Sequence, residues 1–163
     1  MADNPEKTIK LNLNETPQHA EALGDMTVAW SLLEFRLLSL FQAVSGMNRD
    51  PARAIFYNLQ SFRAKCDSIQ AMARISLPSK TCEKIESFLK KVNKTAAKRN
   101  KYTHNPWATL DGEAGIWDLS HRASIPTLSA VKLKDLHQTT QQIYQWSDDM
   151  DTLVKTVSRQ LRS

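Results

Sequence analysis

Glycine and proline are scarce in this chain, with 4 and 6 occurrences among 163 residues. Disordered chains and β-sandwiches with many tight turns need more of both residues, so the composition excludes these classes. Long stretches without either residue are typical of helical bundles, and the length suits one domain with a sizeable core. We therefore predict an all-α fold.

Long apolar runs and paired cysteines are absent as well. The longest uninterrupted apolar run is four residues, from Ala54 to Tyr57, whereas a membrane-spanning helix needs about 20. The polar N-terminus has no signal-peptide pattern, so we expect a soluble, cytoplasmic protein without a membrane partner. Cys66 and Cys82 lack the spacing of a zinc site, and we expect two buried thiols instead of a disulfide.

The sequence contains no pattern of a cofactor or metal site. None of the 4 glycines lies at a strand-to-helix turn, which argues against a phosphate-binding loop. Asp148, Asp149 and Asp151 are clustered, but no complementary ligands accompany them. We expect a solvated face with an ion pair between Asp151 and Lys155.

Apolar residues recur at helical spacing over most of the chain. Pro17 and Pro51 each mark the start of a helix, and Pro78 interrupts the second one. The predicted helices span residues 17–46, 51–77, 79–104 and about 131–161. This pattern predicts a four-helix bundle.

Two short segments have the pattern of strands or loops. Alternation of Ile9, Leu11 and Leu13 with polar residues predicts a short half-buried strand or a loose tail within residues 1–15. The segment 107–119 has Asp111-Gly112 between apolar runs, which predicts a β-hairpin or an ordered loop between the third and fourth helices. Residues 16–163 are expected to form a single domain.

Positive charge is concentrated on the third predicted helix. Between Glu86 and Asp111 the chain has no acidic residue. The basic residues of this stretch are Lys90, Lys91, Lys94, Lys98, Arg99 and Lys101. Such a helix is expected to face a polyanion, and the alternative is an ordinary solvated surface.

Residues 99–104, Arg-Asn-Lys-Tyr-Thr-His, close this helix just before a proline. Asn100 and His104 are four residues apart and share a face, and Arg99 lies about 100° around the helix from Asn100. A guanidinium can bind phosphate oxygens in a fork, and an imidazole transfers protons near neutral pH. These groups suit the cleavage of RNA without a metal ion.

This hexapeptide resembles the motif of the HEPN superfamily, in which an arginine, often followed by a polar residue, precedes a histidine by a few residues. The resemblance extends to a helical bundle with the motif late in the chain and to the spacing of Trp30 and Glu34 on the first helix. It implies a metal-independent endoribonuclease. In that activity His104 assists the attack of a ribose 2′-OH on the adjacent phosphate, Arg99 stabilises the developing charge, and Asn100 binds phosphate or orients His104.

The resemblance also implies partners and a biological role. HEPN ribonucleases usually act as homodimers whose two motifs meet at the interface, so RNA and a second copy of the chain are the expected partners. The expected role is that of a toxin or an antiviral abortive-infection effector. A cognate antitoxin or another defence-system subunit is a further expected partner, and no cofactor is expected.

Substrate contacts are expected beside the motif. The candidate substrate-binding residues are Lys94, Lys98, Lys101, Tyr102 and Trp107. The lysines would bind phosphates and the aromatic rings would stack on bases, while the commoner use of a residue such as Trp107 is to pack the hairpin onto the bundle.

A competing hypothesis is a non-catalytic helical module that binds RNA or a protein partner. In this case Arg99 pairs with a carboxylate of the bundle, such as that of Glu34, and extends its aliphatic stem along the apolar seam. His104 then serves only as a polar helix end that interacts with the helix dipole.

Overall fold

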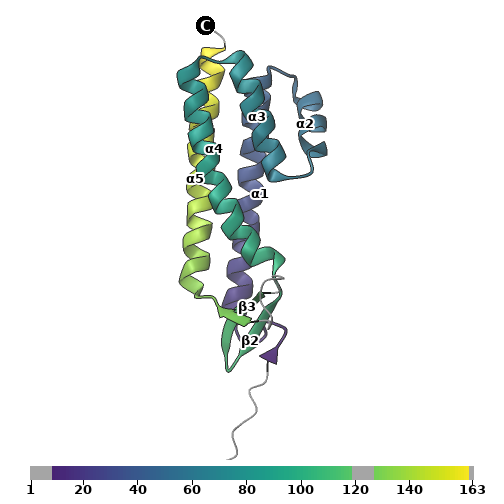
Figure 1. Cartoon of the computed structure of the whole chain (residues 1–163), viewed down its shortest axis with the longest axis vertical. Coiled ribbons are helices and arrows are strands. Elements are labelled where there is room, and N and C mark those ends of the chain that lie inside the picture. Colours follow the sequence, from purple (N-terminus) through teal and green to yellow (C-terminus); the bar gives the residue numbers. More distant parts are fainter. Residues whose placement is uncertain (1–8, 119–126, 162–163) are drawn as a thin grey trace, which may run out of the picture.

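Five helices and a small antiparallel sheet form the part of the chain that the structure describes (Figure 1). The structure is a computed structural model, and it describes residues 9–118 and 127–161. The elements are β1 (Ile9–Lys10), α1 (Pro17–Ser45), α2 (Arg49–Asn58), α3 (Phe62–Ser76), α4 (Ser79–His104), β2 (Trp107–Leu110), β3 (Glu113–Asp118), β4 (Thr127–Ala130) and α5 (Leu133–Gln160). A mostly helical fold is confirmed, whereas the all-α class and the number of helices need correction.

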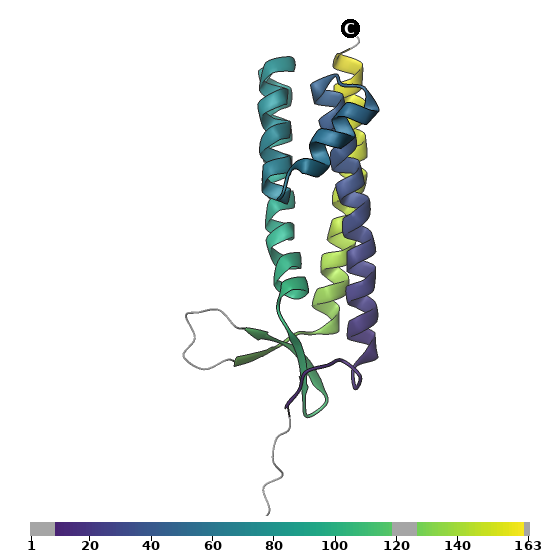
Figure 2. The same cartoon turned by 90° about the vertical axis from the view of Figure 1, so that its right-hand side faces the viewer.

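α1 and α5 lie side by side and run in the same direction, and both begin next to the sheet (Figures 1 and 2). Near the sheet, Nε2 of His19 is 2.9 Å from the carbonyl oxygen of Val131. Further along, Nη1 of Arg36 donates to the carboxylate of Asp151 at 2.6 Å. α4 runs in the opposite direction, and α2 and α3 lie beside only the half of the bundle that is remote from the sheet.

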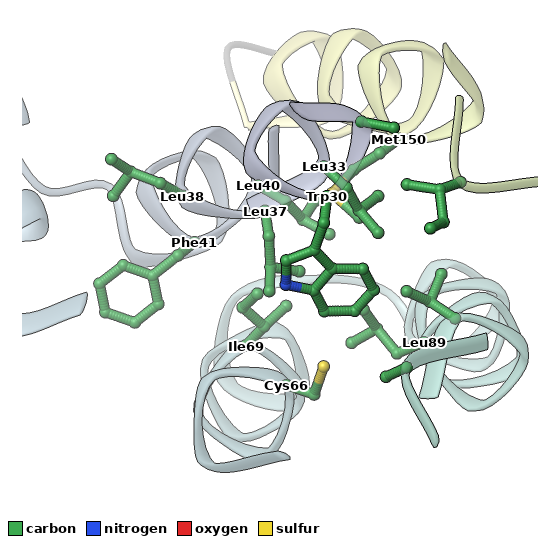
Figure 3. Packing of buried hydrophobic residues seen from close by; sticks show 14 of the residues in the cluster. Trp30, Leu33, Leu37, Leu38, Leu40, Phe41, Cys66, Ile69, Leu89 and Met150 are labelled. Carbon is green, nitrogen blue, oxygen red and sulfur yellow. The ribbon is translucent and has the colours of Figure 1, made fainter. Parts of the chain in front are cut away.

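The core lies where apolar stripes from the long helices meet. Figure 3 shows Trp30 pointing from α1 into the space between α3 and α4, with Cys66 of α3 and Leu89 of α4 near its ring. Ile69 of α3 and Met150 of α5 belong to the same cluster, and both are fully buried. One connected core therefore joins all five helices, and Trp30 lies within it.

The second predicted helix is in fact two helices, α2 and α3, separated by residues 59–61. Ser61 begins α3, because its side chain accepts a hydrogen bond from the backbone N–H of Ala64 at 3.1 Å. Apolar residues keep a helical spacing through this break, so periodicity alone predicts one helix. The two helices differ in phase: Phe56 of α2 is fully buried, whereas Ile55, which belongs to the predicted stripe, is 44% exposed.

The predicted hairpin is present, and it belongs to a larger sheet. Asp111 and Gly112 have φ angles of 51° and 79°, as a tight hairpin turn between β2 and β3 requires. β4 pairs with the free edge of β3, and β1 pairs with β2, giving the antiparallel order β1-β2-β3-β4. Residues 1–8 and Leu119, which belong to predicted segments, lie outside the described residues.

The N-terminal strand is shorter and more exposed than the alternation predicts. Strand pairing covers only Ile9 and Lys10, and Ile9 is 42% exposed. Leu11, the next apolar residue of the pattern, is 66% exposed. Of the two alternatives, a half-buried strand or a loose tail, the structure therefore has a two-residue strand that is exposed and not half-buried.

Within the described residues, α1 is the one helix that is long and apolar enough to cross a membrane by length and composition. Of its most apolar window, 44% is buried inside the structure. A core helix of a soluble protein passes the same test, and the inward face of α1 provides much of the core. The structure is thus consistent with a soluble protein.

Candidate functional site

Arg99 lies where α1, α3 and α4 meet. Its guanidinium carbon Cζ is 5.3 Å from the centre of the Trp30 ring, a distance typical of a cation–π contact. The same Trp30 ring packs on Phe62, the first residue of α3, with 4.8 Å between ring centres. Arg99 is half-buried, as expected for an arginine on an inward-facing seam.

Arg99 forms no ion pair with any carboxylate among the described residues. Its Nη1 donates to Oδ1 of Asn100 at 3.2 Å, and its Nε is buried without a hydrogen-bond partner in this part of the chain. Glu34 accepts instead from the ammonium of Lys65 at 2.9 Å. The Arg99–Glu34 ion pair expected for a non-catalytic module is therefore not formed.

The guanidinium of Arg99 is a partly desolvated positive charge. Burial lowers its pKa, and the negative charge of nearby Glu34 opposes this effect. An arginine nonetheless stays protonated at neutral pH. Because a partly buried cation is costly, an anion that accepts from the terminal Nη atoms would offset part of this cost, although the buried Nε stays out of its reach. The position of Arg99 is therefore suited to binding an anion.

Lys65 is a component of this region that the sequence did not reveal. Its side chain is only 11% exposed, and its ammonium lies 4.9 Å and 5.7 Å from the ring centres of Phe56 and Tyr57. By pairing with Glu34, Lys65 neutralises the carboxylate that would otherwise compete with a phosphate for Arg99. No sequence pattern predicts this contact, because it depends on how α3 packs against α1.

Asn100 and His104 are exposed in the last turns of α4, and Asn100 directly follows the half-buried Arg99. His104 is the last helical residue, and Asn105 has extended dihedral angles (φ −94°, ψ 146°), so the helix ends where the following proline predicts. Within the described residues, a hydrogen bond joins Arg99 to Asn100, but none joins His104 to either of them. The imidazole is accessible to a ligand on this surface.

Tyr102 and Trp107 pack together where the chain leaves α4 for β2. Their ring centres are 6.4 Å apart, and Nε1 of Trp107 donates to the backbone oxygen of Tyr102 at 2.7 Å. Tyr102 is 7% exposed, and burial together with the charge of Asp135 raises its pKa, against a smaller opposite effect of its hydrogen bond with Thr139. These contacts give both aromatic residues a packing role, and Tyr102 has no open face for a base.

Lys94, Lys98 and Lys101 are exposed on α4, and none of them forms an ion pair with another residue in the described ranges. Lys94 and Lys98 line a groove between α4 and α5, and Lys101 follows nearer to the end of the helix. Of the predicted site residues, the structure thus joins Arg99 and Asn100 directly. It places His104 and the three lysines on the adjoining surface.

In comparisons with known proteins, the chain matches no family model, no curated protein and no solved structure. Among the residues that the structure describes, no group of three or more His, Cys, Asp or Glu side chains is placed to hold a metal ion. The chemical interpretation of the site therefore depends on the geometry of its own residues.

Proposed function

We propose that this protein is a metal-independent endoribonuclease of the HEPN type. The observation that carries the proposal is the position of Arg99, a protonated guanidinium held on Trp30 without a carboxylate partner among the described residues. An exposed amide and an exposed imidazole lie on the same helix end, at Asn100 and His104. This is the set of groups that cleavage of a phosphodiester by its own 2′-hydroxyl needs.

In the proposed reaction, a ribose 2′-oxygen attacks the adjacent phosphorus while the bond from phosphorus to the 5′-oxygen breaks. His104 accepts the proton of the 2′-hydroxyl as a general base. Arg99 donates hydrogen bonds to the non-bridging oxygens as their negative charge grows, and the Asn100 amide donates to the same phosphate. The 5′-oxygen leaves with a proton from a general acid, so the products carry a 2′,3′-cyclic phosphate and a 5′-hydroxyl.

A homodimer would supply the general acid. One chain has one motif histidine, whereas the reaction uses an acid and a base, so His104 of a second copy is the proposed proton donor. The outward face of α1 has an apolar stripe at helical spacing, formed by Val28, Leu32 and Phe35, which are 64%, 37% and 48% exposed. We assign this stripe to a contact between copies that is separate from the motif, because helical spacing places it on the side of α1 opposite Trp30 and Arg99.

The proposed biological role follows from the resemblance of the motif to that of HEPN ribonucleases. A homodimeric nuclease of this type would act on cytoplasmic RNA as a toxin or an abortive-infection effector. A cognate antitoxin or another subunit of a defence system would be its regulatory partner.

Cleavage of mixed-sequence single-stranded RNA in EDTA tests the proposal. The wild type should produce 2′,3′-cyclic phosphate ends, and Arg99→Ala and His104→Ala should each lower the rate by about 10²- to 10⁴-fold. Arg159→Ala and His137→Ala change exposed residues of α5 and should cleave like the wild type. Thermal unfolding of each variant separates a loss of chemistry from a loss of folding.

Two results would contradict the nuclease proposal. The first is intact RNA after incubation with the wild type over a wide range of sequences. The second is equal cleavage by the motif variants and the control variants, which would indicate a contaminating nuclease. RNA binding without cleavage would favour the competing hypothesis of a non-catalytic binding module.

A further inference from the structure

A polar groove of about 700 Å³ lies between α4 and α5, beside the candidate site. This volume is within the range of about 300–1,000 Å³ that is usual for ligand sites. α4 contributes Lys94, Thr95 and Lys98, and α5 contributes Thr139 and four glutamines, Gln138, Gln141, Gln142 and Gln145. The groove therefore has a cationic wall facing an amide wall.

The α4 wall attracts negative charge. Lys94 and Lys98 are one helical turn apart, or about 6 Å along the axis, which is comparable to the spacing of successive phosphates in an extended single strand. No carboxylate lines the groove. Just outside the lining, Asp149 accepts from the amide of the lining residue Gln145 at 2.9 Å.

The α5 wall offers unused amide groups. Spacings of three and four residues place the glutamines on one side of the helix. In the part of the chain that the structure describes, the side chains of Gln138, Gln141 and Gln142 form no hydrogen bond. Each amide has both a donor and an acceptor, the combination that pairs with the edge of a nucleobase.

A continuous row of exposed side chains leads from the groove to the motif. Lys94, Lys98, Lys101 and His104 follow one another at steps of four, three and three residues, so they are neighbours along the surface of α4. Arg99 directly follows Lys98 in the chain. A strand that occupies the groove can thus continue around the helix to Arg99 and His104.

We infer that the α4–α5 groove binds a segment of single-stranded RNA next to the phosphate that is cleaved. Lys94 and Lys98 bind two phosphates of this segment, and Gln138, Gln141 and Gln142 bind the edges of its bases. A segment with unpaired bases fits this arrangement, because a duplex keeps its base edges paired. The inference depends on the proposed function, which supplies RNA as the substrate, and adds the single-stranded subsite.

Binding of a fluorescein-labelled 2′-O-methyl RNA oligonucleotide tests the subsite, because this probe has no 2′-hydroxyl and stays intact. Lys94→Gln/Lys98→Gln should weaken binding by roughly tenfold and reduce the slope of log Kd against log salt by about 1.4, or about 0.7 for each lost phosphate contact. The matched control is Lys80→Gln/Lys84→Gln, which removes the same charge with the same spacing at the other end of α4. Its Kd should change by less than about threefold.

Substitution of the glutamines should affect RNA binding differently from substitution of the lysines. Gln138→Ala/Gln142→Ala should weaken binding by about tenfold, because amide contacts to base edges are lost, and it should leave the salt dependence unchanged. In the cleavage assay, the groove variants should raise KM and keep kcat, since none of these side chains touches the reacting phosphate. Both glutamines are outside the motif, so an unchanged kcat and an unchanged melting temperature of this variant would show that only binding is affected.

Three outcomes would overturn the subsite. They are an absence of oligonucleotide binding, equal weakening by the groove pair and the control pair of lysines, and an unchanged Kd in the glutamine variant. The two proposals fail separately. Groove-dependent binding without cleavage by the wild type contradicts only the nuclease, whereas cleavage that is unaffected by the groove variants contradicts only the subsite.

Discussion

Burial favours the uncharged form of both Cys66 and Arg99, but only Cys66 is uncharged at neutral pH. Both cysteines are buried and free, as predicted. Burial raises the pKa of the Cys66 thiol to about 12, and its hydrogen bond with Asn93 only partly offsets this rise, so the thiol stays protonated and unreactive at neutral pH. Arg99 keeps its charge in spite of burial. Cys66 is thus a packing residue, whereas Arg99 retains the property that an anion-binding site needs.

Asp151 connects stability to pH at the level of one side chain. Its hydrogen bond with Lys155 lowers its pKa in the folded state, burial opposes this effect in part, and the charge of Arg36 lowers the pKa further. A depressed pKa means that its contribution to stability is complete above the pKa of the unfolded chain, near 4, and is lost as the pH falls through the lower folded value. The predicted ion pair with Lys155 is confirmed at 2.7 Å.

Asp151→Asn should therefore lower the melting temperature at pH 7, and the difference from the wild type should disappear as the pH approaches 2. Thermal unfolding followed by circular dichroism over this pH range measures the effect. Asp148→Asn is the control, because Asp148 is exposed and forms no ion pair among the described residues. A constant difference for Asp151→Asn at all pH values would refute the assignment.

At the scale of elements, the backbones of β3 and β4 approach each other closely at Gly115. A Cβ atom added at Gly115 would lie 2.7 Å from the backbone oxygen of Ser129, because β3 and β4 are directly paired there. Gly24, in the interior of α1, has open space around the corresponding position. The two glycines thus predict opposite effects of the same substitution.

Gly115→Ala should destabilise the protein by about 1–3 kcal/mol, because the clash is with backbone and β3 and β4 must separate to relieve it. Gly24→Ala should stabilise it by about 0.5–1 kcal/mol, because alanine is the better helix former. Urea unfolding of both variants measures the difference. Equal effects of the two substitutions would contradict the close strand pairing.

Local signals made several elements predictable from the sequence. Pro17, the Asp111-Gly112 turn and the proline after Asn105 act within a few residues, so the structure has helix ends and a hairpin where these residues predict them. The break before α3 was missed because Ser61 is a single capping residue within an uninterrupted apolar rhythm. β4 was missed because it has only four residues and because no tight-turn signal links it to β3, whose paired residues lie 9 to 15 positions earlier.

The same distinction applies to the candidate site. The motif on α4 was predictable because its residues share one helix, and their helical phase follows from the sequence. The contact of Arg99 with Trp30, the pairing of Glu34 with Lys65 and the groove opposite the glutamines all join different helices. Their existence depends on which helices pack together, and helical periodicity contains no information about that choice.

For the whole molecule, the buried face of α1 forms part of the core, and its exposed apolar stripe is the proposed contact between copies. Leu33 is fully buried in the core, whereas its neighbour Leu32 is 37% exposed within the proposed dimer stripe. Removing the buried side chain leaves a cavity, but removing the exposed one takes little from the folded monomer. Substitutions of these two adjacent leucines therefore test the stability of the monomer and the association of two copies separately.

Leu33→Ala should lower the free energy of unfolding by about 2–5 kcal/mol. Leu32→Ala should change it by less than about 0.5 kcal/mol and should shift sedimentation toward the monomer. Chemical unfolding and analytical ultracentrifugation provide the two measurements. A Leu32→Ala variant that sediments like the wild type would exclude this stripe from the dimer contact.

α1 and α5, which are the first and last helices of the described chain, are each other's most extensive packing partners. During translation, the part of the apolar face of α1 that α5 covers therefore stays exposed until Leu133 and the residues after it have left the ribosome. Contacts so distant in sequence form late, and a nascent chain in this state is a substrate for chaperones. A truncated product without α5 would lack the most extensive packing partner of α1, the helix that carries Trp30 beneath Arg99.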